Sequence, residues 1–171
     1  AAWLKAGGNL LALGIDQTDA DALLPFKVSL KRAEHIAALF APPRAGTLLA
    51  GISPADVHNR DPREVPLVAG GAQILGDGVV AQAENAHVVF CQLAPWQFDG
   101  GPSNLKRTQR RVSVLVARLL ANMGVAGATP LLGRFKQPVA LDGVQPEQRW
   151  LAGLYFDQPE EWDDPYRFFR W

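Results

Sequence analysis

The stretch AHVVFCQL, residues 86–93, decides the fold class because it carries apolar side chains on both faces of an extended chain. Successive side chains of a β-strand point to opposite faces of its sheet, so a strand of this kind is covered on both sides. Double coverage is typical of a parallel sheet that lies under helices. The stretch therefore predicts an α/β protein with residues 86–93 in its central layer.

Other apolar runs predict the neighbouring strands. NLLALGI (9–15) predicts a short buried strand between turn signals, and HIAALFAPP (35–43) predicts a strand or edge segment closed by two prolines. Three strands joined by turns are predicted within residues 67–93, where GDG (76–78) is a hairpin signal. The polar stretch SPADVHNRDPREVP (53–66) has no period and predicts a loop.

Residues 103–124 predict one long helix. Its apolar side chains recur at spacings of three, four and seven residues, which places them on one face. These side chains are Val112, Leu115, Val116, Leu119 and Met123. Ser103 or Asn104 can cap the start, and Gly124 provides the stop. The start also carries a basic group, where the helix dipole favours anions. Its members are Lys106, Arg107, Arg110 and Arg111. Either they face water or an acidic segment faces them.

Composition excludes several classes of protein. The chain has 171 residues, 48% of them hydrophobic, which suits one compact domain, alone or with a tail. Seventeen basic residues balance seventeen acidic ones, so no global field indicates nucleic acid or a membrane surface as partner. No apolar run is long enough for a membrane helix. One Cys excludes a disulfide framework, and the three His show no metal-ligand spacing, so we expect no metal and no cofactor.

The chain changes character near its last quarter. Residues 1–127 predict the α/β domain, whereas residues 128–171 have no helix or strand period and gather aromatic, proline and acidic residues. Disordered tails lack aromatic side chains, so we expect an extended arm that packs on the domain or on a neighbour. Its expected interface anchors are Trp150, Trp162, Tyr166, Phe168 and Trp171. At the other end, a helix stop at Gly7-Gly8 indicates a fragment of a longer protein.

Several long strings resemble a known family. They are WLKAGGNLLALG (3–14), LLAGISPADVHNR (48–60), VVFCQLAPWQFD (88–99), NLKRTQRRVSVLVARLLANMGV (104–125) and LYFDQPEEWDDPYRFFRW (154–171). Together they look like the C-terminal region of large bacterial glycoside hydrolases of the β-galactosidase/β-glucuronidase kind. That region is similar to class I glutamine amidotransferases. The resemblance thus implies a flavodoxin-like, three-layer α/β sandwich, here without its first strands.

The resemblance also implies partners and a compartment. A (β/α)₈ catalytic domain with two carboxylates would lie upstream in the same protein, which would be periplasmic or secreted. A carbohydrate ligand and a homo-oligomer are further implied partners. No motif of this chain matches the family's catalytic carboxylates, so no catalytic residue is assigned here.

Cys91 is the candidate nucleophile that an amidotransferase-like fold raises. Such a nucleophile needs a tight strand-to-helix elbow with small neighbours and a His partner. Here Phe90 and Gln92 flank the thiol, and no glycine forms an elbow. Free Cys is also among the most frequently buried residues. We therefore predict that Cys91 fills the sheet rather than performs chemistry.

Two other stretches carry candidate ligand-binding residues. Asp56, His58, Asn59 and Arg60 follow an apolar run, so they can line a strand end, where open α/β sheets bind ligands. The alternative is that they satisfy the backbone groups of their own loop. Trp96 and Phe98 in PWQFD offer aromatic faces for a sugar ring, or else belong to the core or an interface.

These observations predict a non-catalytic accessory domain of a carbohydrate-degrading glycoside hydrolase. Its task would be to pack against the catalytic domain, to support oligomerisation or to shape a sugar site. Two alternatives stay open. One is a small amidohydrolase or amidotransferase that uses Cys91, and the other is a stand-alone carbohydrate-binding module that uses Trp96.

Overall fold

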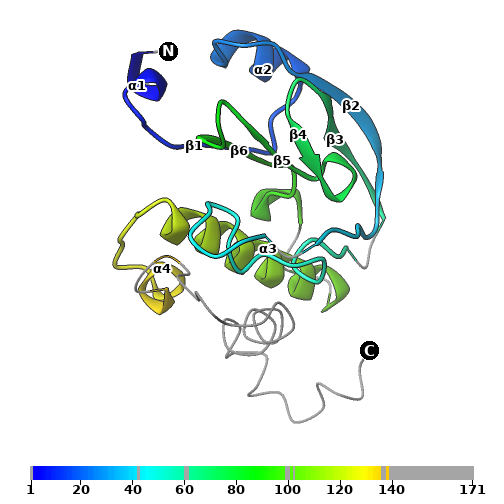
Figure 1. Cartoon of the computed structure of the whole chain (residues 1–171). Helices are drawn as coiled ribbons and strands as arrows, with labels where there is room; N and C mark the ends of the chain where they lie inside the picture. Colours follow the sequence, from blue (N-terminus) through cyan, green and yellow to red (C-terminus); the bar gives the residue numbers. More distant parts are fainter. Residues whose placement is uncertain are drawn as a thin grey trace.

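The computed structural model describes residues 2–41, 43–59, 62–98, 101, 103–135 and 138. The described chain is a mixed α/β protein whose strands lie between helices (Figure 1). The helices are α1 (Ala2–Lys5), α2 (Gln17–Leu23), α3 (Ser103–Asn122) and α4 (Pro130–Arg134). In Figure 1, α2 lies on one side of the strands and α3 on the other.

The described strands form a four-stranded and a two-stranded sheet. The larger sheet has the order β1-β6-β5-β4 and contains β1 (Leu10–Leu13), β4 (Gln73–Leu75), β5 (Val80–Ala83) and β6 (Val88–Cys91). Within it, β1 runs parallel to β6, while β5 is antiparallel to both β6 and β4. The smaller sheet pairs β2 (Ser29–His35) with β3 (Arg63–Gly70) in antiparallel register.

The central position of β6 confirms the interpretation of residues 86–93. All four residues of β6 are buried, and their side chains alternate between two apolar cores. Val89 and Cys91 belong to the core that contains Leu115 of α3. Val88 and Phe90 belong to the core that contains Ala20 of α2. Apolar residues at successive positions are therefore needed, because each face of this strand supports a different layer.

The sheet is less parallel than the sequence indicates. Only β1 and β6 form a parallel pair among the described strands. The GDG turn at Gly76–Gly78 joins β4 to β5 as predicted, and a second short turn, with positive φ at Glu84, Asn85 and Ala86, joins β5 to β6. Connections this short join antiparallel strands only, since a parallel pair requires a long crossover.

Two predicted boundaries are wrong. The strand expected at residues 35–43 ends at His35 and lies instead in Ser29–His35, a largely exposed stretch without an apolar pattern. The loop expected at residues 53–66 ends early, because β3 begins at Arg63 and pairs with β2. Pro66 lies in a strand that is paired along one edge only, and prolines within sheets are found mainly in such edge strands.

Helix α3 confirms the helix predicted at residues 103–124. Leu115 and Leu119 are fully buried against the sheet. The basic group at its start divides: Lys106 and Arg110 are exposed, whereas Arg111 is buried and its Nη1 donates to the carbonyl oxygen of His58 at 2.9 Å. Part of this charge therefore ties the helix to the preceding loop.

The segment predicted as an arm is described only at its start. There, α4 packs on α3 through Phe135, whose ring lies 3.9 Å from the guanidinium carbon of Arg118. Thr129 caps α4 by accepting a hydrogen bond from the backbone of Leu132. The five expected interface aromatics, Trp150, Trp162, Tyr166, Phe168 and Trp171, lie outside the described residues. The division at residue 127 stays a prediction.

Candidate functional site

A pocket of about 530 Å³ lies at the carboxyl ends of the parallel strands β1 and β6. Gly14, Asp16 and Asp19 reach it from the chain that follows β1. Arg32, Arg63 and Glu64 reach it from the two-stranded sheet, and Gln97 reaches it from the chain after β6. Ligands of open α/β sheets bind at this edge, so the pocket is the candidate site that the topology favours.

The chain after β6 enters the site as a single 3₁₀ turn, η2 (Pro95–Gln97). The side chain of Gln97 bonds back to the backbone that precedes this turn. Its Oε1 accepts from the backbone N–H of Ala94 at 2.9 Å, and its Nε2 donates to the carbonyl oxygen of Gln92 at 3.1 Å. Both halves of the amide are thus used to fix the backbone, which holds η2 in one conformation.

Arg63 anchors η2 to the two-stranded sheet. Its Nη1 donates to the carbonyl oxygen of Gln97 at 2.8 Å, and its guanidinium carbon lies 5.2 Å from the centre of the Phe98 ring. Phe98 itself is 2% exposed. Arg63 therefore bridges β3 and η2 by a charge-assisted hydrogen bond and a cation–π contact.

Trp96, at the centre of η2, is open to solvent. Its exposed fraction is 69%, although its neighbours Ala94 and Phe98 are buried. The indole lies beside Gly14 of the pocket wall, since a methyl group placed on Gly14 would lie 3.7 Å from Cζ2 of Trp96 and 3.3 Å from Nε2 of Gln97. The φ of Gly14 is +59°, which favours glycine. The Trp96 side chain therefore lies beside a residue of the pocket wall.

The start of α2 supplies another part of the pocket wall. Asp16 and Asp19 form a capping box, in which Asp16 Oδ1 accepts from the backbone of Asp19 at 2.9 Å and Asp19 Oδ2 accepts from the backbone of Asp16 at 3.3 Å. Both carboxylates are exposed, and each has an oxygen outside these two bonds. They offer hydrogen-bond acceptors to the pocket.

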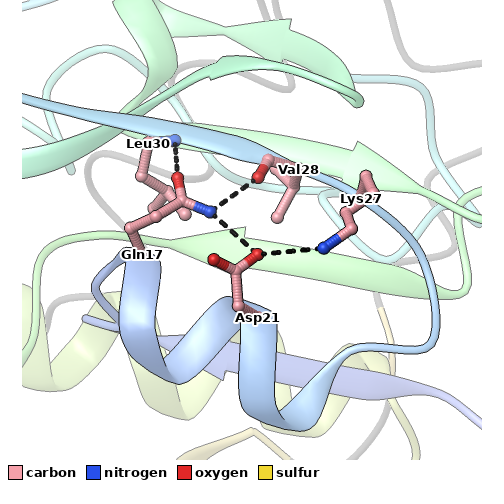
Figure 2. A network of polar contacts seen from close by, with 5 residues as sticks. All are labelled: Gln17, Asp21, Lys27, Val28 and Leu30. Carbon is pink, nitrogen blue, oxygen red and sulfur yellow. Dashed lines mark hydrogen bonds and ion pairs between the residues drawn. The ribbon is translucent and has the colours of Figure 1, made fainter.

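Gln17 fixes this helix to the edge of β2 (Figure 2). Its Oε1 accepts from the backbone N–H of Leu30 at 2.8 Å, while its Nε2 donates to the carbonyl oxygen of Val28 at 3.0 Å. Nε2 also lies 3.2 Å from Oδ1 of Asp21, which forms an exposed ion pair with Lys27. The side-chain amide takes the place of a strand's peptide group, so the wall carrying Asp16 and Asp19 is held against the sheet that carries Arg32.

The loop of residues 53–59 is folded, and the side chain of Asp56 bonds within it. Asp56 is buried, and its Oδ2 accepts from the backbone N–H and the hydroxyl of Ser53 at 2.7 and 2.8 Å. Asn59 is also buried, and its backbone donates to Ile36. His58 is half-buried, and its carbonyl oxygen accepts from Arg111. The three residues lie in a folded loop and do not line the pocket described above. Arg60 lies outside the described residues.

The two aromatic candidates have different environments. Trp96 presents its ring to solvent beside the pocket, whereas the buried Phe98 ring packs in the core and faces Arg63. Phe98 has no face left for a ligand. Trp96 lies within the η2 turn and is exposed, whereas Phe98 directly follows the turn and lies in the core.

Cys91 is sealed in the core. Its exposed fraction is 0%, it packs in the core shared with α3, and its Sγ donates to the carbonyl oxygen of Leu93 at 3.3 Å. Burial raises the pKa of the thiol from 9.0 to about 12, because a thiolate in the apolar core would lose its hydration. The imidazoles of His35 and His87 contact Val57 and Asn9 instead. The sequence prediction that Cys91 is buried in the sheet is confirmed.

We expect Cys91 to be inert toward thiol reagents while the chain is folded. A thiol-specific chromogenic disulfide added at about pH 8 should label it at least about 100-fold more slowly than in denaturant, because reaction requires a solvent-exposed thiolate. Labelling is followed by absorbance. A matching rate in the folded and unfolded chain would contradict the burial.

Several pocket residues were not predicted. Gly14, Asp16 and Asp19 carried a usable signal, since a glycine and acidic residues directly after a buried strand mark its carboxyl end. Arg63 and Glu64 carried none, because they lay in a stretch without a period and are brought to the pocket only by pairing of β3 with β2. Long-range pairing of this kind is not visible in local sequence.

The described residues contain no group of His, Cys, Asp or Glu that could hold a metal ion. Within the same residues, no helix is both long and apolar enough to cross a membrane. Comparisons with protein-family models, with curated proteins and with solved structures found no match to this chain.

Proposed function

We propose that the chain is a non-catalytic accessory domain of a carbohydrate-degrading glycoside hydrolase, with an α/β sandwich of the flavodoxin-like kind. The strings quoted from the sequence support the family. The sheet with α2 and α3 on its two sides supports the layered architecture. Its partner would be a (β/α)₈ catalytic domain in the same polypeptide, and the domain would pack on it, support oligomerisation or shape a sugar site.

The burial of Cys91 is the observation that carries the non-catalytic part of the proposal. An amidotransferase acts through an exposed thiolate beside a His. Here the thiol has no exposed surface, and burial raises its pKa to about 12. The alternative of an amidohydrolase that uses Cys91 therefore lacks both access and an ionised nucleophile.

The carboxylates of the pocket do not supply glycosidase chemistry either. A glycosidase places one carboxyl group in an apolar environment, so that it stays protonated, opposite a second one that stays ionised. Asp16, Asp19 and Glu64 are all exposed to solvent. Solvated groups of this kind are suited to binding hydroxyl groups rather than to transferring a proton at the glycosidic bond.

The proposal is tested on the complete polypeptide from which this chain comes. We expect its reading frame to encode a (β/α)₈ domain that hydrolyses chromogenic β-glycosides. Deleting residues 1–171 should alter the oligomeric state or the KM, whereas Cys91→Ala should leave kcat/KM within about twofold. Glutamine hydrolysis that disappears in the Cys91→Ala variant would overturn the proposal in favour of the amidohydrolase alternative. The absence of any glycosidase domain would also overturn it.

A further inference from the structure

We propose that the pocket beside Trp96 binds a neutral saccharide, one pyranose ring of which stacks on the Trp96 indole. The inference takes the ligand class from the proposed function and adds the site, the platform residue and the charge of the sugar. It rests on an exposed aromatic face, a rigid support for that face and a polar pocket directly beside it.

The first step is the exposure of Trp96. The chain exposes 69% of this side chain, although exposure of a large aromatic surface to water is unfavourable. A ligand with an apolar face removes that surface from water. Pyranose rings have such faces, formed by their C–H groups, while their hydroxyl groups point outward. The indole therefore suits a flat ring with a polar rim.

The second step is the rigidity of the support. Gln97 closes the η2 turn through both atoms of its side-chain amide, and Arg63 holds the same turn from β3. Phe98, two residues after Trp96, is buried and anchors the turn in the core. A platform that is already ordered loses little conformational freedom on binding, and this favours affinity for a small ligand.

The third step is the polar complement of the neighbouring pocket. Sugar hydroxyl groups donate and accept, so they suit a mixed wall. Among the lining residues, Asp16, Asp19 and Glu64 carry carboxylates that can accept hydrogen bonds. Arg32 and Arg63 carry guanidinium groups that can donate them. A volume of about 530 Å³ lies in the range of small-molecule sites. One or two sugar units fit there.

The fourth step is the charge of the pocket. Three acidic residues and two arginines are among the residues that line it. Arg63 already donates to the carbonyl oxygen of Gln97. Arg32 Nη2 donates to the carbonyl oxygen of Glu64 at 3.2 Å, and Arg32 Nε lies 4.0 Å from Oε2 of the Glu64 carboxylate. An anionic sugar would meet an excess of negative charge, and neutral hydroxyl groups would not. The balance therefore favours a neutral saccharide over a uronate or a sulfated sugar.

The test is a calorimetric titration of the 171-residue chain with neutral hexasaccharides and with hexagalacturonate as the anionic probe. The neutral probes are cellohexaose, xylohexaose, mannohexaose and β-1,4-galactohexaose. At least one should bind more tightly than hexagalacturonate. Trp96→Ala should weaken that binding at least tenfold, which separates the platform from the rest of the pocket.

Trp3→Ala is the matched control, because Trp3 is also an exposed tryptophan, at 56%, but lies against Gly8, whereas Trp96 lies beside Gly14 of the pocket wall. It should bind like the unmodified chain. Unchanged affinity in Trp96→Ala, tighter binding of hexagalacturonate, or no binding of any neutral probe at millimolar concentration would overturn the inference. If the parent polypeptide has a glycosidase domain but the chain binds no saccharide in this way, only the binding site is rejected. If the chain binds but no such domain exists, only the proposed function is rejected.

Discussion

Replacing Phe90 by alanine is expected to lower the free energy of unfolding by about 3–5 kcal/mol, the largest effect of any single truncation in this sheet. The Phe90 ring is fully buried at the centre of β6. Its partners across the two neighbouring strands are Ala12 and Ala81, and it meets Phe26 edge-on, with ring centres 6.4 Å apart. Small flanking residues cannot move in to fill the space, so the cavity persists.

Urea denaturation followed by circular dichroism measures this loss. Trp96→Ala is the matched aromatic control, because its side chain is mostly exposed and should change the free energy of unfolding by less than about 1 kcal/mol. A loss below about 1 kcal/mol in Phe90→Ala would show that the ring is not enclosed by the sheet and α2. The comparison thus tests the packing of that face of the layer directly.

The elements that the sequence predicts correctly are those whose surroundings are uniform. Residues 88–91 are apolar throughout because both faces of β6 are covered. Apolar residues of 103–124 repeat at helical spacing because one face of α3 packs on the sheet. The GDG turn is local in origin, since Asp77 adopts a positive φ between two glycines. In each case one short-range rule determines the structure.

The pair β2 and β3 escapes prediction for a physical reason. Most side chains of β2 face water, so the strand has no apolar pattern, and its edge is held by the side chain of Gln17. Its partner begins at Arg63, in a stretch that resembles a loop. Such strands are specified by pairing over more than twenty residues, and single-sequence patterns do not report pairing.

The candidate site likewise contains residues that the sequence indicates and residues whose availability depends on the tertiary structure. Trp96 is a candidate because aromatic faces pack on the apolar faces of sugar rings, and its exposure beside the pocket wall keeps that hypothesis in force. Asp56 and Asn59 have the right chemistry for a ligand, yet both are buried, and Asp56 bonds within its own loop. Residue type predicts what a group can bind, and only the tertiary structure determines whether it is available.

The second large effect is a loss of stability at alkaline pH. In the unfolded chain Cys91 ionises near 9.0, whereas burial in the folded chain raises its pKa to about 12. Between these values the folded state binds one proton more than the unfolded state, so the free energy of unfolding falls as the pH rises. The fall approaches about 1.4 kcal/mol for each pH unit, or on the order of 4 kcal/mol over the full interval. Below pH 9 the contribution is fully present.

Paired urea titrations of the unmodified chain and Cys91→Ala, from about pH 8 to about pH 11, isolate this contribution. Tyr and Lys ionise in the same range in both proteins, so only the difference between the two curves reports the thiol. Cys91→Ala should be less stable by about 1 kcal/mol at neutral pH, because a small cavity forms, and should lose less stability as the pH rises. The two curves should therefore converge and cross. Parallel curves would mean that the thiolate is solvated in the folded chain, and the argument against a nucleophilic Cys91 would fail with them.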